Sequence, residues 1–151
     1  MQKIASFTVD HDKLRPGMYI SRVDGDVTTF DLRTRRPNGG DYMDTCTAHT
    51  VEHMLATFLR NGKIGPNVLY FGPMGCRTGF YLLTRGLPPE TVREAITKAL
   101  QATIDYEGPV FGASRRECGN YLDLDLASAQ RECAAYLQVL NTVRGDFKYE
   151  N

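Results

Sequence analysis

The chain has 151 residues, 42% of them hydrophobic, and its 18 Lys and Arg residues balance its 18 Asp and Glu residues. This length predicts a single domain over residues 1–151, and the zero net charge argues against binding to nucleic acid or to anionic lipid. No apolar run approaches the roughly 18 residues of a membrane span, and the N-terminal segment lacks the apolar stretch of a signal peptide. We therefore expect a cytoplasmic protein with no membrane contact, whose four cysteines are core residues, metal ligands or catalytic groups rather than disulfides.

The first third of the chain has the composition of β-strands. Short segments rich in β-branched and aromatic residues predict strands at 4–9, 18–23 and 27–33, separated by glycine-containing turns. A helix is predicted over 45–61, because apolar residues recur there at helical spacing and Gly62 follows as a natural stop.

The remaining two-thirds of the chain contain further predicted strands and helices. Strands are predicted at 67–71 and 78–84, around a Gly-Pro-Met-Gly turn. Helices are predicted at 89–105 and 126–143, the second with Asp125 as its N-cap. Strands and helices cluster along the chain, so we predict an α+β fold in which a largely antiparallel sheet packs against three to four helices.

The most informative segment is His49-Thr50-Val51-Glu52-His53, which holds two of the chain's three histidines. Residues four apart on a helix share one face, so His49 and His53 could bind one metal ion. At about 100° per residue, with Ala48 at zero, the apolar stripe covers roughly 240° to 20° and the histidines lie near 100° and 140°. Glu52, near 40° on the same scale, borders both faces, where partial desolvation suits a carboxylate to proton transfer. The pattern matches the inverted zincin motif and favours a metal site over two unrelated surface histidines.

A catalytic metal usually has three protein ligands and one open position. Cys118 is the best third candidate, because it lies in a polar, glycine-containing segment rather than on an apolar helical face. Cys133, by contrast, lies on the apolar stripe of its predicted helix and reads as a core residue, and Cys46 is more typical of a structural position.

Cys76 is the other unusual thiol. It lies in the glycine-rich turn Gly72-Pro73-Met74-Gly75-Cys76-Arg77, with Arg77 next to it. Exposed backbone N–H groups and a guanidinium both favour a thiolate, so this cysteine could be reactive. A turn cysteine without a role is an equally good interpretation from the chemistry alone.

Five separate motifs make the chain resemble the S-ribosylhomocysteine lyase (LuxS) family. They occur in the family's order over about the first 126 residues. The matching segments are Ser6-Phe7 with Asp10-His11, Phe30-Asp31-Leu32-Arg33 followed by Pro37-Asn38, His49-Thr50-Val51-Glu52-His53, Pro73-Met74-Gly75-Cys76-Arg77-Thr78-Gly79, and Cys118-Gly119-Asn120-Tyr121.

The resemblance implies cleavage of S-ribosyl-L-homocysteine to L-homocysteine and 4,5-dihydroxy-2,3-pentanedione, the precursor of autoinducer-2, within the activated methyl cycle. It implies ferrous iron (Fe2+), with Zn2+ or Co2+ as possible substitutes, bound by His49, His53 and Cys118. It also implies that Glu52 and Cys76 are the two acid/base groups of the reaction.

The resemblance further implies a homodimer with active sites at the subunit interface. Ser6, His11 and Arg33 match family residues that bind or orient the sugar. Arg60 aligns with a family arginine near the homocysteine moiety; without the resemblance it would read as a favourable charge at a helix C-terminus.

The chain also departs from the family's usual pattern. Tyr70 stands where family members usually have an acidic residue, six positions before Cys76, and Leu124 stands where many have a histidine. Residues 14–19 and the Phe71-Gly72 pair also differ from the common motifs. These changes affect recognition of the homocysteine amino group and leave open a divergent lyase with a modified substrate.

Two other interpretations remain at this stage. One is a small inverted-zincin metallohydrolase, in which Glu52 activates water and Glu117 or Glu132 is the third ligand. The other is a non-catalytic module stabilised by metal, which normally needs four protein ligands. The sequence offers only three good candidates, which favours a catalytic site.

Overall fold

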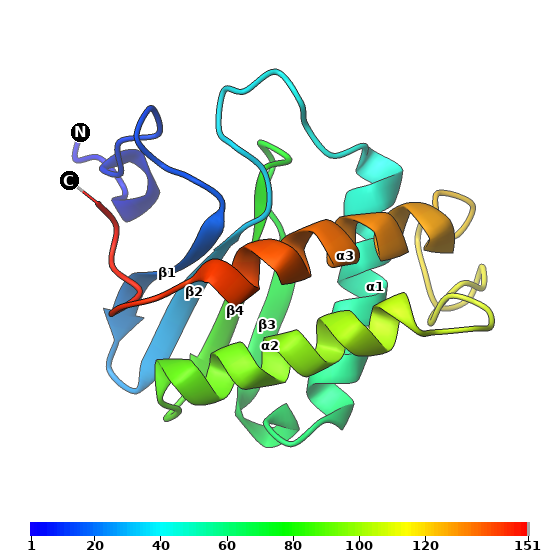
Figure 1. Ribbon diagram of the computed structural model, residues 1–151. Coiled ribbons are helices and arrows are strands. Elements are labelled where there is room, and N and C mark those ends of the chain that lie inside the picture. Colours follow the sequence, from blue (N-terminus) through cyan, green and yellow to red (C-terminus); the bar gives the residue numbers. More distant parts are fainter. Residues whose placement is uncertain (151) are drawn as a thin grey trace.

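The computed structural model describes residues 1–150 and has an α+β fold, in which a four-stranded antiparallel sheet is covered on one face by three helices (Figure 1). The predicted fold class is confirmed. The strands are β1 (Gly17–Asp24), β2 (Val27–Arg33), β3 (Val68–Pro73) and β4 (Gly79–Arg85). The helices are α1 (Thr45–Asn61), α2 (Pro89–Ile104) and α3 (Leu126–Thr142), with two 3-10 turns, η1 (Ala5–Phe7) and η2 (Gly65–Asn67).

The sheet has the order β1-β2-β4-β3, and every neighbouring pair is antiparallel. Side chains alternate between its two faces. On β2, Phe30 and Leu32 are buried in the core under the helices, whereas Asp31 and Arg33 point to the opposite face. Those two charged side chains are nevertheless 1% and 3% exposed, so the opposite face of the sheet is also partly covered.

The core forms where the apolar stripes of the three helices meet the sheet. Val51 and Leu55 of α1 and Ile96 of α2 are buried in this cluster. Cys133 of α3 belongs to the same cluster and is 1% exposed, which confirms its assignment to the core. Burial raises the pKa of the Cys133 thiol to about 12, so this cysteine stays neutral and inert.

The helix boundaries follow the local signals in the sequence. Helix α1 has the predicted bounds, and the N–H of Gly62 closes it by donating to the carbonyl of Leu59. Asp125 is the N-cap of α3, because its carboxylate accepts a hydrogen bond from the N–H of Ala127. The local signals therefore define the ends of both helices, and α1 carries the two histidines of interest.

The predicted strand at 4–9 is wrong. This segment contains the 3-10 turn η1, and none of the residues of that turn is buried. The Thr8 hydroxyl donates to the carbonyl of Ala5, a local bond of the kind that competes with extended pairing. The apolar residues of this segment therefore do not enter the sheet.

Residues 105–125 connect α2 to α3 without helix or strand and run beside α1 (Figure 1, yellow to orange). Backbone carbonyls of this segment contact both histidines of α1. None of the described helices is long and apolar enough to cross a membrane.

Candidate metal centre and active site

His49 and His53 lie on one side of α1, as their spacing predicts, and both are half-buried. Their ring centroids are 4.6 Å apart and the rings meet edge to face. The two imidazoles are therefore close enough for both to reach one bound ion.

Each imidazole is oriented by a backbone carbonyl of residues 105–125. His49 Nδ1 lies 2.9 Å from the carbonyl oxygen of Asp123, and His53 Nδ1 lies 2.7 Å from that of Phe111. A carbonyl oxygen can only accept a hydrogen bond, so Nδ1 carries the proton on both rings. In the neutral ring this tautomer leaves a free lone pair on Nε2, the state that a metal ligand requires.

Gly112 makes room for the second of these rings. Its backbone has φ +67°, a left-handed conformation that suits glycine, and a Cβ added there would lie 3.3 Å from His53 Nδ1. The chain therefore passes close to the imidazole and delivers the preceding carbonyl, that of Phe111, to it. Sequence reasoning missed this glycine, although glycine at a close backbone approach is a familiar signal.

Cys118 completes the group. Its Sγ lies 3.4 Å from His49 Nε2 and accepts a hydrogen bond from the N–H of Asn120, also at 3.4 Å. One potential ligand atom from each of His49, His53 and Cys118 lies within 4.8 Å of the others, and among residues 1–150 no other such group of His, Cys, Asp and Glu occurs. Two imidazole nitrogens and one thiolate form a donor set that fits a divalent transition metal and leaves a coordination position open.

The two glutamates considered as third ligands are engaged elsewhere. Glu132 is 7% exposed and forms a two-pronged ion pair with Arg35 at 2.7 and 3.0 Å. Glu117 accepts a hydrogen bond from Ser114. Neither glutamate belongs to the metal-ligand group of the described residues, so both assignments are wrong.

Glu52 shares an open cavity of about 420 Å³ with His49. Gly75, in the turn between β3 and β4, and Asn120 also line this cavity. Glu52 is half-buried, as expected from its place between the apolar and metal faces of α1. The cavity thus brings a carboxylate, a candidate metal ligand and the residue before Cys76 to one space.

Cys76 is exposed at the tip of the turn, and its Sγ lies 3.1 Å from the Thr78 hydroxyl. The cation beside it is Arg33, whose Nη1 lies 3.8 Å from Sγ. Arg77, the neighbour in sequence, instead directs its Nη1 to the carbonyl of Met43 at 3.3 Å. A guanidinium does lie near this thiol, but it comes from β2.

Ser6, His11 and Arg60 do not line the cavity beside His49. Ser6 is half-buried, and His11 directs Nδ1 to the carbonyl of Val9 at 2.9 Å. Arg60 donates to the carbonyls of Val68 and Leu69 at 3.4 and 3.1 Å and so links the end of α1 to β3. Ser6 and His11 therefore belong to the N-terminal segment, and Arg60 to the far end of α1.

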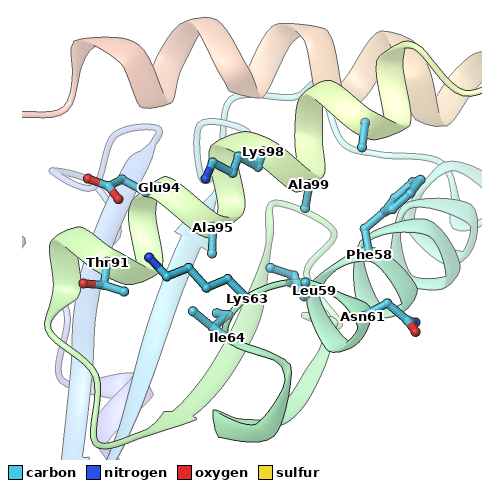
Figure 2. A pocket seen from close by; sticks show the side chains of 12 residues that line it. Phe58, Leu59, Asn61, Lys63, Ile64, Thr91, Glu94, Ala95, Lys98 and Ala99 are labelled. Carbon is cyan, nitrogen blue, oxygen red and sulfur yellow. The ribbon is translucent and has the colours of Figure 1, made fainter.

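A second cavity, of about 250 Å³, lies between the C-terminal end of α1 and the facing side of α2 (Figure 2). Its wall includes the apolar side chains of Leu59 and Ile64, with the charged ends of Lys63, Glu94 and Lys98 on the same side. No histidine or cysteine lines it. Of the two cavities, the one beside His49 is therefore the better candidate for the site of hydrolytic or lyase chemistry.

Comparison with known proteins identifies a family for these residues. The sequence profile of the family described as S-ribosylhomocysteinase (LuxS) matches residues 4–145. An S-ribosylhomocysteine lyase of Clostridium beijerinckii is 44% identical to this chain over 159 residues, covering 100% of both chains. The S-ribosylhomocysteine lyase of Finegoldia magna is 46% identical, and the match covers 95% of both chains. That of Clostridium acetobutylicum is 45% identical, and the match covers 97% of this chain and 96% of its relative.

Proposed function

The chain belongs to the S-ribosylhomocysteinase (LuxS) family, and we propose that it is a lyase that cleaves S-ribosyl-L-homocysteine to L-homocysteine and 4,5-dihydroxy-2,3-pentanedione. One observation carries the proposal. The cavity beside the His49, His53 and Cys118 group also contains Glu52 and borders the Cys76 turn.

We assign His49, His53 and Cys118 as the ligands of one Fe2+ ion per chain, for which Zn2+ or Co2+ could substitute. The free Nε2 lone pairs and the Cys118 sulfur, close to one another, support this assignment. When bound, the ion supplies a Lewis acid for oxygens of the sugar.

Glu52 and Cys76 are proposed as the proton-transfer groups. The thioether cannot leave until the sugar carbonyl has moved along the chain of carbons. Each move takes a proton from one carbon and delivers a proton to its neighbour or to oxygen, which suits a carboxylate and a thiolate acting in turn. In the last step a proton is lost from the carbon next to the carbonyl, the C–S bond breaks, and the sulfur takes up a proton to give homocysteine. No redox partner is needed.

Arg33 contributes charge to this chemistry. Its guanidinium is buried and its Nη1 faces Cys76 Sγ at 3.8 Å, so a positive charge lies beside the sulfur. Burial alone would lower the pKa of Arg33, but its hydrogen bonds to Asp31 and the nearby negative charge raise it above the usual value. The side chain therefore remains cationic throughout the reaction.

We further propose a cytoplasmic homodimer in which Ser6, His11, Arg33 and Arg60 contribute to substrate binding. Ile4 and Phe7, on either side of Ser6, are 59% and 68% exposed. Large apolar side chains at such exposure support a contact surface for a second copy around the N-terminal segment.

The proposal is tested by anaerobic incubation of the iron-loaded protein with S-ribosyl-L-homocysteine and a thiol reagent. Thiol release that depends on bound metal supports the lyase. The peptidase alternative predicts peptide cleavage instead, and its metal content would survive loss of Cys118.

A further inference from the structure

The C-terminal segment returns from α3 to the free edge of β1 (Figure 1, red). The N–H of Ile20 donates to the carbonyl of Phe147 at 2.7 Å, and the Phe147 side chain is buried in the core cluster. Two residues further on, the ring of Tyr149 stacks on Tyr19 of β1, with centroids 5.0 Å apart and planes inclined by 19°. These contacts hold Tyr149 over the sheet face that the helices leave free.

The phenol of Tyr149 donates a hydrogen bond to Asp31 Oδ2 at 2.7 Å. Burial, together with the negative charge of Asp31, raises the pKa of Tyr149 far above its usual value, so the phenol keeps its proton and remains a donor. Asp31 is opposite Tyr19 in the β1–β2 register, which places it directly beside the stacked rings.

Asp31 in turn orients Arg33. Its two carboxylate oxygens accept from Arg33 Nε at 3.1 Å and from Nη2 at 2.7 Å, a two-pronged pair that fixes the plane of the guanidinium. The remaining nitrogen, Nη1, then faces Thr78 Oγ1 at 2.8 Å and Cys76 Sγ at 3.8 Å. The residues paired with Arg33 on β1 and β4 are Gly17 and Gly79, so neither paired position places a side chain beside it.

We propose that Tyr149 is a positioning residue for the lyase reaction, acting through Asp31 and Arg33 on Cys76. Tyr149 lies in the C-terminal segment, beyond the residues 4–145 that the family profile matches. The inference rests on the proposed function, since it assumes that Cys76 takes part in proton transfer.

Tyr149 affects where the charges of Asp31 and Arg33 lie. Asp31 Oδ2 accepts from both Tyr149 and Arg33 Nη2, so the phenol limits the positions that the buried carboxylate can take. Without the phenol the carboxylate has one partner fewer, and the Arg33 plane is held less firmly. Because Nη1 is already 3.8 Å from Sγ, a small rotation is enough to weaken its electrostatic interaction with the sulfur.

The test compares Tyr149→Phe, which removes only the hydroxyl and keeps the stacked ring, with Lys148→Gln in the same segment. The Lys148 side chain is exposed and its ammonium pairs only with Asp146 among the described residues. Two rates are measured on metal-loaded protein: turnover of S-ribosyl-L-homocysteine, and alkylation of Cys76 by iodoacetamide at fixed pH, followed by mass spectrometry of the Cys76 peptide. A thermal melt of each variant accompanies them.

Tyr149→Phe is expected to slow both Cys76 alkylation and kcat by roughly three- to tenfold, since a typical hydrogen bond contributes at about this level. Lys148→Gln should leave both rates unchanged. A Tyr149→Phe protein whose melting temperature falls while both rates stay at the wild-type level would overturn the proposal, because Tyr149 would then be only structural. Slower alkylation with unchanged turnover would uphold the positioning of Arg33 and instead contradict the catalytic role of Cys76.

Discussion

His49 Nε2 and Cys118 Sγ lie 3.4 Å apart, although 69 residues separate them in the chain. The contact depends on residues 105–125, which have no regular secondary structure and yet direct two carbonyls to the Nδ1 atoms of the histidines. An irregular segment thus supplies the third donor atom and orients the two imidazole rings.

Replacement of Cys118 by alanine is expected to remove most of the bound metal. Loss of a residue that only orients a ligand typically lowers metal affinity 10- to 100-fold, so loss of the ligand should lower it by at least about 100-fold. Metal content by mass spectrometry after dialysis checks this, with Cys46→Ala on the first turn of α1 as the matched cysteine control. Near-normal metal retention in Cys118→Ala would reject it as a ligand.

Gly112→Ala is expected to weaken metal binding by about tenfold, because the new Cβ would press on the His53 ring that Phe111 orients. Gly86 provides the control, since it also has φ +67° but nothing lies within 4 Å of an added Cβ. Both alanine variants should lose about 1 kcal/mol of folding free energy from backbone strain. Competition with a chelator measures the metal affinity of each variant. Equal affinities in Gly112→Ala and Gly86→Ala would show that the close approach to His53 has no effect on metal binding.

Glu52→Gln and Cys76→Ala should each keep the fold and the metal but lose most of the thiol release. Both groups are proposed to transfer protons in successive steps, and removal of such a group typically costs roughly 10²-fold or more in rate. Steady-state kinetics on the metal-loaded variants provides the measurement. Full activity in Cys76→Ala would exclude that thiol from the mechanism.

Tyr70→Asp is expected to lower KM for S-ribosyl-L-homocysteine. Tyr70 is 52% exposed, and the resemblance implies that it stands where an acidic residue would pair with the substrate's ammonium group. A charged hydrogen bond contributes about 1–3 kcal/mol, which is reduced here by solvent exposure. Tyr70→Phe serves as the control, since it removes the hydroxyl without adding charge. If the aspartate and phenylalanine variants have the same KM, Tyr70 has no part in amino-group recognition.

Mixing His11→Ala chains with Glu52→Gln chains tests whether the active site is shared between subunits. Each variant alone should be nearly inactive. If each site takes His11 from its partner, mixed dimers contain one intact site and recover up to about half of the activity per dimer, by the symmetry of a two-site dimer. Absence of recovery after subunit exchange has been verified would contradict a shared site.

Local signals in the sequence predicted much of the scaffold. Periodicity and Gly62 gave the bounds of α1, and Asp125 caps α3 as expected. The strand predicted at 4–9 was wrong because residue composition alone does not reveal that a segment lacks a pairing partner. The neighbouring Thr8 forms a local bond instead.

The residues of the candidate metal site could be predicted from the sequence, but the neighbouring residues that contact them in the fold could not. Helical spacing placed His49 and His53 together, and a polar context identified Cys118. The cation beside Cys76 was assigned to its sequence neighbour Arg77, because contacts across a sheet cannot be read from adjacency. Arg33 occupies that place through the β2–β4 register, which pairs it with Gly79.

The most direct test of the account is the stoichiometry of products from S-ribosyl-L-homocysteine on anaerobic, iron-loaded protein. The account predicts that free homocysteine thiol and 4,5-dihydroxy-2,3-pentanedione appear in equal amounts, and that both are lost in Glu52→Gln protein with the same metal content. Failure to release thiol above the level of the metal-free protein, with the iron site verified as filled, would contradict it.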